Sequence, residues 1–156
     1  MAGARKVKLD CEGSFSTAAA KAVEVRSREV FAHSDGVLDL DQVERVHDMR
    51  VATRRLRAAL EIFEPCFPCK RHRKALKKVE ALADALGERR DADVEIALLE
   101  ELAGDAAEAD RAAMRRLVEA RRARQREAND ELAAYVTPKR LGKLRRRLKK
   151  LARAGS

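Results

Sequence analysis

The chain has 156 residues, of which 46% are apolar, yet it contains only four Phe, one Tyr and no Trp. This length suits one domain with a sizeable aliphatic core, and the dominance of Ala, Leu, Arg, Lys and Glu favours long helices over a sheet. The net charge of +9 comes from residues 139–153, and such a basic tail is either a solvated helix or a nonspecific contact for a polyanion. Because no segment resembles a membrane span or a signal peptide, we expect a cytoplasmic protein.

The sequence predicts an all-α fold, an antiparallel bundle of about six helices with a basic surface groove. We expect a flexible N-terminus at residues 1–13 and one helical domain at residues 14–153. The first helix can start within the segment Ser14-Phe15-Ser16 and extend through His33. Arg26 falls on the apolar stripe of this helix, where a guanidinium either pairs with an acid or turns toward an anion site.

Two rows of side chains run along the second predicted helix, which Asp39 or Asp41 can cap and which ends before Pro65. The apolar row is Val46, Met49, Thr53, Leu56, Leu60 and Phe63. The other, here called the basic row, is His47, Arg50, Arg54 and Arg57. The basic row repeats the 3, 4, 3 spacing one residue later, so it lies about 100° round the helix over roughly 15 Å. An ordinary solvated face mixes acids with bases, whereas this row contains no carboxylate, so we expect it to bind an anion.

A turn with two cysteines follows the second helix. Pro65 and Pro68 end that helix and bring Cys66 and Cys69 into the turn. A thioredoxin-like motif needs a βαβ context, and a zinc site needs two more ligands, of which only His72 is near in sequence. We therefore interpret the thiols as unligated and expect no metal. The odd total of three cysteines argues against a disulfide framework.

The third and fourth helices are predicted to be separate. The third covers residues 71–86 and ends at Gly87, as at a C′ glycine. Its flank carries the lysines Lys74, Lys77 and Lys78. The fourth is acidic and ends at Gly104. Its apolar side is Val94, Leu98 and Leu102.

The fifth predicted helix, residues 106–136, would be roughly 45 Å long at 1.5 Å per residue. Its seam is Met114, Leu117, Arg121, Gln125, Ala128, Leu132 and Tyr135. Arg121 interrupts this seam and either joins the anion site or reaches water past a packed stem. The last helix begins at Thr137 and Pro138, a cap followed by proline at the first helical position. It combines a row of four leucines with nine cations and no acid.

The residues offer little for catalysis. The chain has no glycine-rich phosphate loop, no His-Glu-x-x-His pair and no acidic strand. His47 suits the role of a neutral hydrogen-bond partner or an anion contact better than a catalytic role. Binding chemistry is better represented, because the planar fork of Arg can hold two phosphate oxygens at once. Few aromatic residues could stack on bases, and no helix-turn-helix spacing is present. A phosphate chain without bases fits best, and we expect no enzymatic activity and no cofactor.

Two motifs resemble a known family. Residues 46–57, VHDMRVATRRLR, resemble the signature of CHAD domains, the conserved histidine α-helical domains that bind inorganic polyphosphate. Residues 86–94, LGERRDADV, are similar to the Leu-Gly-x-x-Arg-Asp-x-Asp-Val segment of the same family. The resemblance covers at least residues 43–99. It implies a helical bundle with a basic groove for polyphosphate, residence in the cytoplasm or at polyphosphate granules, and no activity of its own.

The resemblance also assigns residues. It implies ligand contacts from His47, Arg50, Arg54, Arg57, Lys74, Lys77, Lys78, Arg90 and Arg121. Longer family members carry a second histidine–arginine helix that is not found here, so this chain looks like a short or half-length form. We therefore expect a homodimer, with the leucine row of the last helix as its apolar surface. The alternative function is nonspecific nucleic-acid binding through the basic C-terminal helix.

Overall fold

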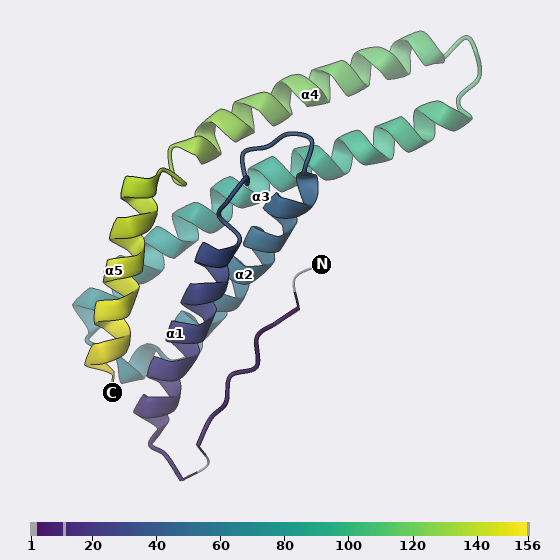
Figure 1. Cartoon of the computed structure of the whole chain (residues 1–156). Helices are drawn as coiled ribbons and strands as arrows, with labels where there is room; N and C mark the ends of the chain where they lie inside the picture. Colours follow the sequence, from purple (N-terminus) through teal and green to yellow (C-terminus); the bar gives the residue numbers. More distant parts are fainter. Residues whose placement is uncertain (1–2, 11, 156) are drawn as a thin grey trace.

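Helices form all the regular structure that the computed structural model describes, which covers residues 3–10 and 12–155 (Figure 1). Within these residues the elements are α1 (Phe15–Ala32), α2 (Val43–Ile62), the 3₁₀ turn η1 (Glu64–Cys66), α3 (Cys69–Asp105), α4 (Arg111–Ala133) and α5 (Pro138–Ala154). The all-α class is confirmed. The expected third and fourth helices are instead one helix of 37 residues, so the described part of the chain has five α-helices rather than six. Cys11 lies outside the described residues.

The long helix α3 continues through both of its glycines. The prediction that Gly87 ends a helix is wrong, and Gly104 lies inside the last turn. A glycine within a helix costs only about 1 kcal/mol relative to alanine, so packing can override it. Here α3 packs against α2 along its first half and against α4 along its second half, and these contacts continue across Gly87 (Figure 1).

The core lies between α1, α2, α3 and α5. The apolar row of α2 faces it as predicted: Val46, Met49, Thr53, Leu56 and Leu60 are fully buried, and Phe63 is half-buried. From α5, Leu148 and Leu151 pack into the same cluster and are each only 1% exposed. The half of the leucine row nearest the C-terminus of α5, expected from the sequence to form a dimer surface, is therefore covered by the chain itself, while Leu141 and Leu144 are only partly buried.

The start of α1 agrees with its sequence. Ser14 caps the helix by accepting a hydrogen bond from the Thr17 amide at 3.1 Å. Arg26 forms an ion pair with the buried carboxylate of Glu29 at 2.9 Å, which is the pairing alternative considered for this residue. The same two side chains hold the N-terminal segment, because the Arg5 amide donates to Glu29 and Arg26 donates to the Arg5 carbonyl.

A buried polar cluster joins α3 to α4. Arg89 and Asp93 form an ion pair in which both side chains are at most 1% exposed. Gln125 donates to Asp93 at 2.7 Å, and Arg89 Nε donates to Asn129 at 3.2 Å. Burial, followed by the charge of Arg90, lowers the pKa of the Arg89 guanidinium. These four residues, Arg89, Asp93, Gln125 and Asn129, are called the buried node below. The node explains why Gln125 falls within an otherwise apolar seam.

The end of the α3–α4 hairpin differs from the prediction. Val94, Leu98 and Leu102, expected to be buried, are each at least half exposed, as is Leu117 of α4. In the part of the seam nearer α5, Ala128 and Leu132 are fully buried. Within this hairpin, α3 and α4 therefore contact the core only at the end that lies nearest α5.

Candidate anion-binding surface

The basic row lies along the contact between α2 and α3. Three contacts fix an antiparallel register: Arg90 with Glu44 at 3.8 Å, Arg57 with Glu80 at 3.5 Å, and Arg50 beside Gly87, where an added Cβ would lie 4.0 Å from Arg50 Nε. Because the neighbouring apolar row is buried, the row one residue later must emerge at the edge of the helix pair. Accordingly, His47, Arg50 and Arg57 are half-buried, and Arg54 is exposed.

Carboxylates accompany the end of the row nearest the C-terminus of α2. Arg57 Nε donates to Glu61 at 2.8 Å, and its Nη2 lies 3.5 Å from Glu80 on α3. The hydrogen bond from Arg57 to Glu61 is the main reason that the pKa of Arg57 is raised. An anion that binds Arg57 must therefore compete with two carboxylates. The sequence suggested a row without acids. In the fold, the next turn of α2 supplies Glu61 and the neighbouring helix α3 supplies Glu80.

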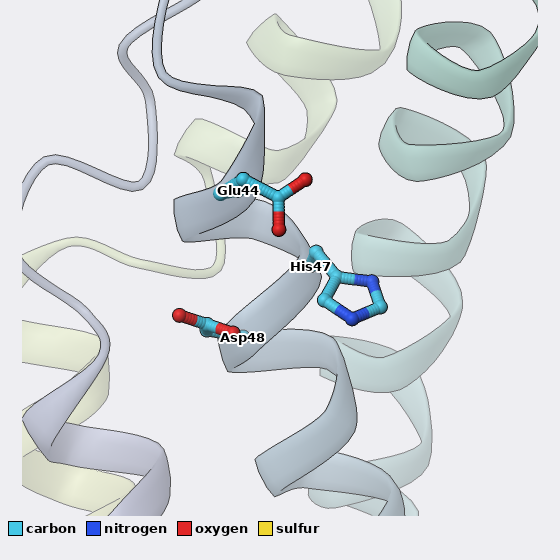
Figure 2. A group of neighbouring side chains, drawn as sticks. All are labelled: Glu44, His47 and Asp48. Carbon is cyan, nitrogen blue, oxygen red and sulfur yellow. The ribbon is translucent and has the colours of Figure 1, made fainter. Parts of the chain in front are cut away.

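The other end of the row has acidic neighbours as well. Ligand atoms of Glu44, His47 and Asp48 lie within 4.8 Å of one another. Figure 2 shows the imidazole of His47 pointing toward α3, with Glu44 one turn earlier and Asp48 on the other flank of α2. Three such groups could hold a cation, but exposed acids beside a histidine are common without one. The group therefore does not by itself define a metal site, and the expectation of no metal stays a prediction.

The centre of the row has uncompensated charge. Arg50 and Arg54, one helical turn apart, make no ion pair with any described residue. Gly87 contributes no side chain beside Arg50, where an added Cβ would lie 4.0 Å from Arg50 Nε. Two adjacent guanidiniums that form no ion pair with a described residue are the feature best suited to an incoming anion.

The three predicted lysines of α3 do not share one face. Arg73, Lys77, Glu80 and Asp84 follow 4, 3, 4 spacing, which places Lys77 on the flank that reaches Arg57 through Glu80. Lys74 and Lys78 lie on the other flank, where Arg147 of α5 donates to the Lys74 carbonyl at 3.3 Å. Helical spacing therefore favours Lys77 over Lys74 and Lys78 as the lysine nearest the basic row.

Of the two remaining predicted arginines, one lies beside the row and the other does not. Arg90 reaches Glu44, next to His47, and its side chain is only 20% exposed. Arg121 instead pairs with Glu95 of α3 at 2.9 Å in the α3–α4 hairpin, where it is half exposed. Sequence reasoning missed the carboxylates of Glu61 and Glu80. The i,i+4 spacing of Arg57 and Glu61 could have revealed the first, but the second depends on how the helices pair.

A hollow of about 740 Å³ lies away from the basic row, between α1 and α5. Phe31 lies at this hollow, and the Arg145 guanidinium stacks over its ring at 4.6 Å. Its cations are Lys21, Arg28, Arg145, Lys149 and Arg153, and its acid is Glu24. No residue of α2 lines it, so the basic groove predicted beside α2 is not confirmed.

These features define an all-helical bundle that presents a row of cations on its second helix. The sequence model of the CHAD domain matches residues 21–156, nearly the whole chain. The chain therefore belongs to the CHAD domain family, as the two motifs suggested. A search of curated proteins finds no match. Among the described residues, no helix combines the length and the apolar character that crossing a membrane requires.

Proposed function

We propose that this chain binds inorganic polyphosphate along the basic row, without a catalytic step, and that binding targets it to polyphosphate granules in the cytoplasm. The observation that carries the proposal is the pair Arg50 and Arg54, two adjacent guanidiniums without a carboxylate partner among the described residues. Membership of the CHAD family, known in polyphosphate-binding contexts, supports the choice of anion.

The chemistry of the row suits a phosphate chain. Each guanidinium can donate two parallel hydrogen bonds to phosphate oxygens, and such charge-assisted bonds are about twice as strong as neutral ones. The row extends over roughly 15 Å of helix, so successive phosphates can meet successive side chains. In this arrangement Arg50 and Arg54 bind first, with His47 and Arg90 beyond one end and Arg57 with Lys77 beyond the other.

The test replaces Arg50 and Arg54 singly by Gln and measures the Kd for long-chain polyphosphate. Each change should weaken binding by about 1–3 kcal/mol, because a charged hydrogen bond to the ligand is lost while the buried apolar row of α2 stays intact. The slope of log affinity against log salt should fall by somewhat under 1 per lost phosphate contact, by analogy with counterion release from nucleic acids. Circular dichroism should show unchanged helix content.

Arg55 provides the matched control within the same helix. It follows Arg54 by one residue, so it lies about 100° farther round α2 from the basic row. Arg55→Gln should therefore change the Kd much less than Arg54→Gln. Equal losses of affinity for the two variants would show that polyphosphate binding depends only on the overall charge, and the proposal for the basic row would be abandoned.

A second candidate is nonspecific nucleic-acid binding through α5. The observation in its favour is the charge of residues 139–153, nine cations without an acid. Deleting α5 would not test it cleanly, because Leu148 and Leu151 belong to the core. Replacing exposed Lys143, Arg146 and Lys150 by Gln removes charge without touching the core. If this variant loses duplex DNA and polyphosphate equally at matched salt, α5 rather than the basic row is the binding surface.

A further inference from the structure

Four large apolar side chains are exposed at the outer end of the α3–α4 hairpin. Val94, Leu98, Leu102 and Leu117 are 50%, 54%, 51% and 51% exposed. They are called the hairpin patch below. Figure 1 shows this end of the hairpin extending beyond α1, α2 and α5, so no other helix is near enough to cover it. Single exposed apolar residues are ordinary, but four within residues 94–117 are not.

The register of the hairpin brings these residues together. Arg121 pairs with Glu95 at 2.9 Å, which fixes the level at which α4 meets α3. Leu117 lies one turn from Arg121 toward the tip of the hairpin. On α3, Leu98 and Leu102 lie one and two turns from Glu95 in the same direction. Since residues three and four apart share a helix face, Val94, Leu98 and Leu102 form one row along α3, and Leu117 shares the flank of α4 that carries Arg121.

The charge around the patch indicates what covers it. Residues 91–110 contain eight carboxylates and no Lys or Arg, whereas residues 111–126 contain seven Arg and one Glu. The hairpin therefore has an acidic helix beside a basic one. Some of these charges find partners within the chain, including Glu95 with Arg121 and Glu100 with Arg122.

Other charges of both signs remain available near the patch. Among the described residues, no ion pair is formed by Asp91, Glu101, Asp105, Arg115, Arg116 or Arg126. A second hairpin related by a two-fold axis would place its basic α4 against the acidic α3 of the first, and the reverse contact would form at the same time. A second copy of this chain is thus complementary in both charge and apolar character.

We propose that the hairpin patch is a self-association surface, through which two chains pack their α3–α4 hairpins into a four-helix unit with two-fold symmetry. Such packing buries the four apolar side chains of each copy and pairs the remaining acids of α3 with the arginines of the partner's α4. The surface is distinct from the basic row, so self-association does not depend on polyphosphate.

The first test is sedimentation of the full chain over a concentration series. Wild-type protein should reach the mass of a dimer, and Leu98→Glu should raise the dissociation constant about tenfold or more, because it puts a charge in the centre of the patch. Ile62→Glu is the matched control, since Ile62 is 67% exposed at the end of α2 and lies outside the patch. A wild-type chain that stays monomeric at its highest soluble concentration would overturn the proposal.

The second test reverses charges. The variant Glu101→Lys/Asp105→Lys and the variant Arg115→Glu/Arg116→Glu should each dimerise more weakly than wild type. An equimolar mixture of the two should recover the dimer, because every contact between unlike copies then joins opposite charges. Two results would refute the hairpin contact. One is a mixture that does not recover the dimer. The other is a dimer that persists in each charge-reversed variant alone and in Leu98→Glu.

Discussion

Replacing Asp93 by Asn should destabilise the protein strongly although it changes no side-chain volume. Asp93 is paired with Arg89, and the two side chains are 1% and 0% exposed. Asn preserves the shape and the polar contact with Gln125 but removes the negative charge, so no cavity contributes to the change. Breaking a buried ion pair by removing one partner costs about 3–5 kcal/mol, because the other charge stays buried without compensation.

The measurement is urea unfolding followed by circular dichroism, with thermal melting as a second readout. A loss of this size corresponds to a fall in Tm of roughly 6–20 °C for a domain of this length. The matched control is Glu88→Gln, which breaks the pair with Arg124 on the outside of the same hairpin. Those side chains are 58% and 44% exposed, so solvent screens the pair and the loss of stability should be small.

Equal effects of the two substitutions would refute this reasoning, because it depends on the difference in burial. A small effect of Asp93→Asn alone would mean that water reaches Arg89. The result also bears on the family motif at residues 86–94. A large loss of stability with unchanged polyphosphate affinity would assign Asp93 to the structure of the hairpin rather than to the ligand.

Three further predictions concern α3 and the basic row. Gly87→Ala should raise the unfolding free energy by about 0.5–1 kcal/mol, since Gly87 is inside a helix and the new Cβ would meet only Arg50 at an ordinary contact distance; a loss measured by urea unfolding would restore the interpretation of Gly87 as a helix end. Lys77→Gln should weaken polyphosphate binding more than Lys78→Gln, because helical spacing puts Lys77 on the same flank of α3 as Glu80, which contacts Arg57 of α2; equal Kd values would contradict that placement. Glu61→Gln should strengthen polyphosphate binding by removing one of the two carboxylates that compete for Arg57, and an unchanged Kd would show that the ligand does not reach this end of the row.

The sequence predicts individual helices well, because their signals are local. The periodicity of α2 identifies its buried row, Ser14 caps α1, and Thr137 caps α5 by accepting from the Arg140 amide at 3.2 Å. The break expected at Gly87 fails for a physical reason. A glycine signals a helix end only through a local preference of about 1 kcal/mol, and the packing of α3 between α2 and α4 outweighs it.

The candidate site is predictable only in part. Helical spacing identifies the basic row, since the side chains that form it belong to one helix. Whether each cation is free depends on the neighbouring helix, and neither the contact of Arg57 with Glu80 nor the split between Lys77 and Lys78 follows from spacing within one segment. The burial of Arg89 does not follow from the sequence, because the residue stands in a segment of many charged residues. Its burial depends on partners from α4 and on its pair with Asp93.

The arginines of this chain differ in role because of their neighbours, not their chemistry. Arg89 is enclosed with a carboxylate and two amides, so it contributes to the fold and cannot meet a ligand. Arg57 and Arg121 lie at the surface but are matched by acids, so an anion gains from them only what it takes from those acids. Arg50 and Arg54 have no such competitor among the described residues. An anion therefore gains their full charge, and this is why two residues, rather than the net charge of +9, should determine where polyphosphate binds.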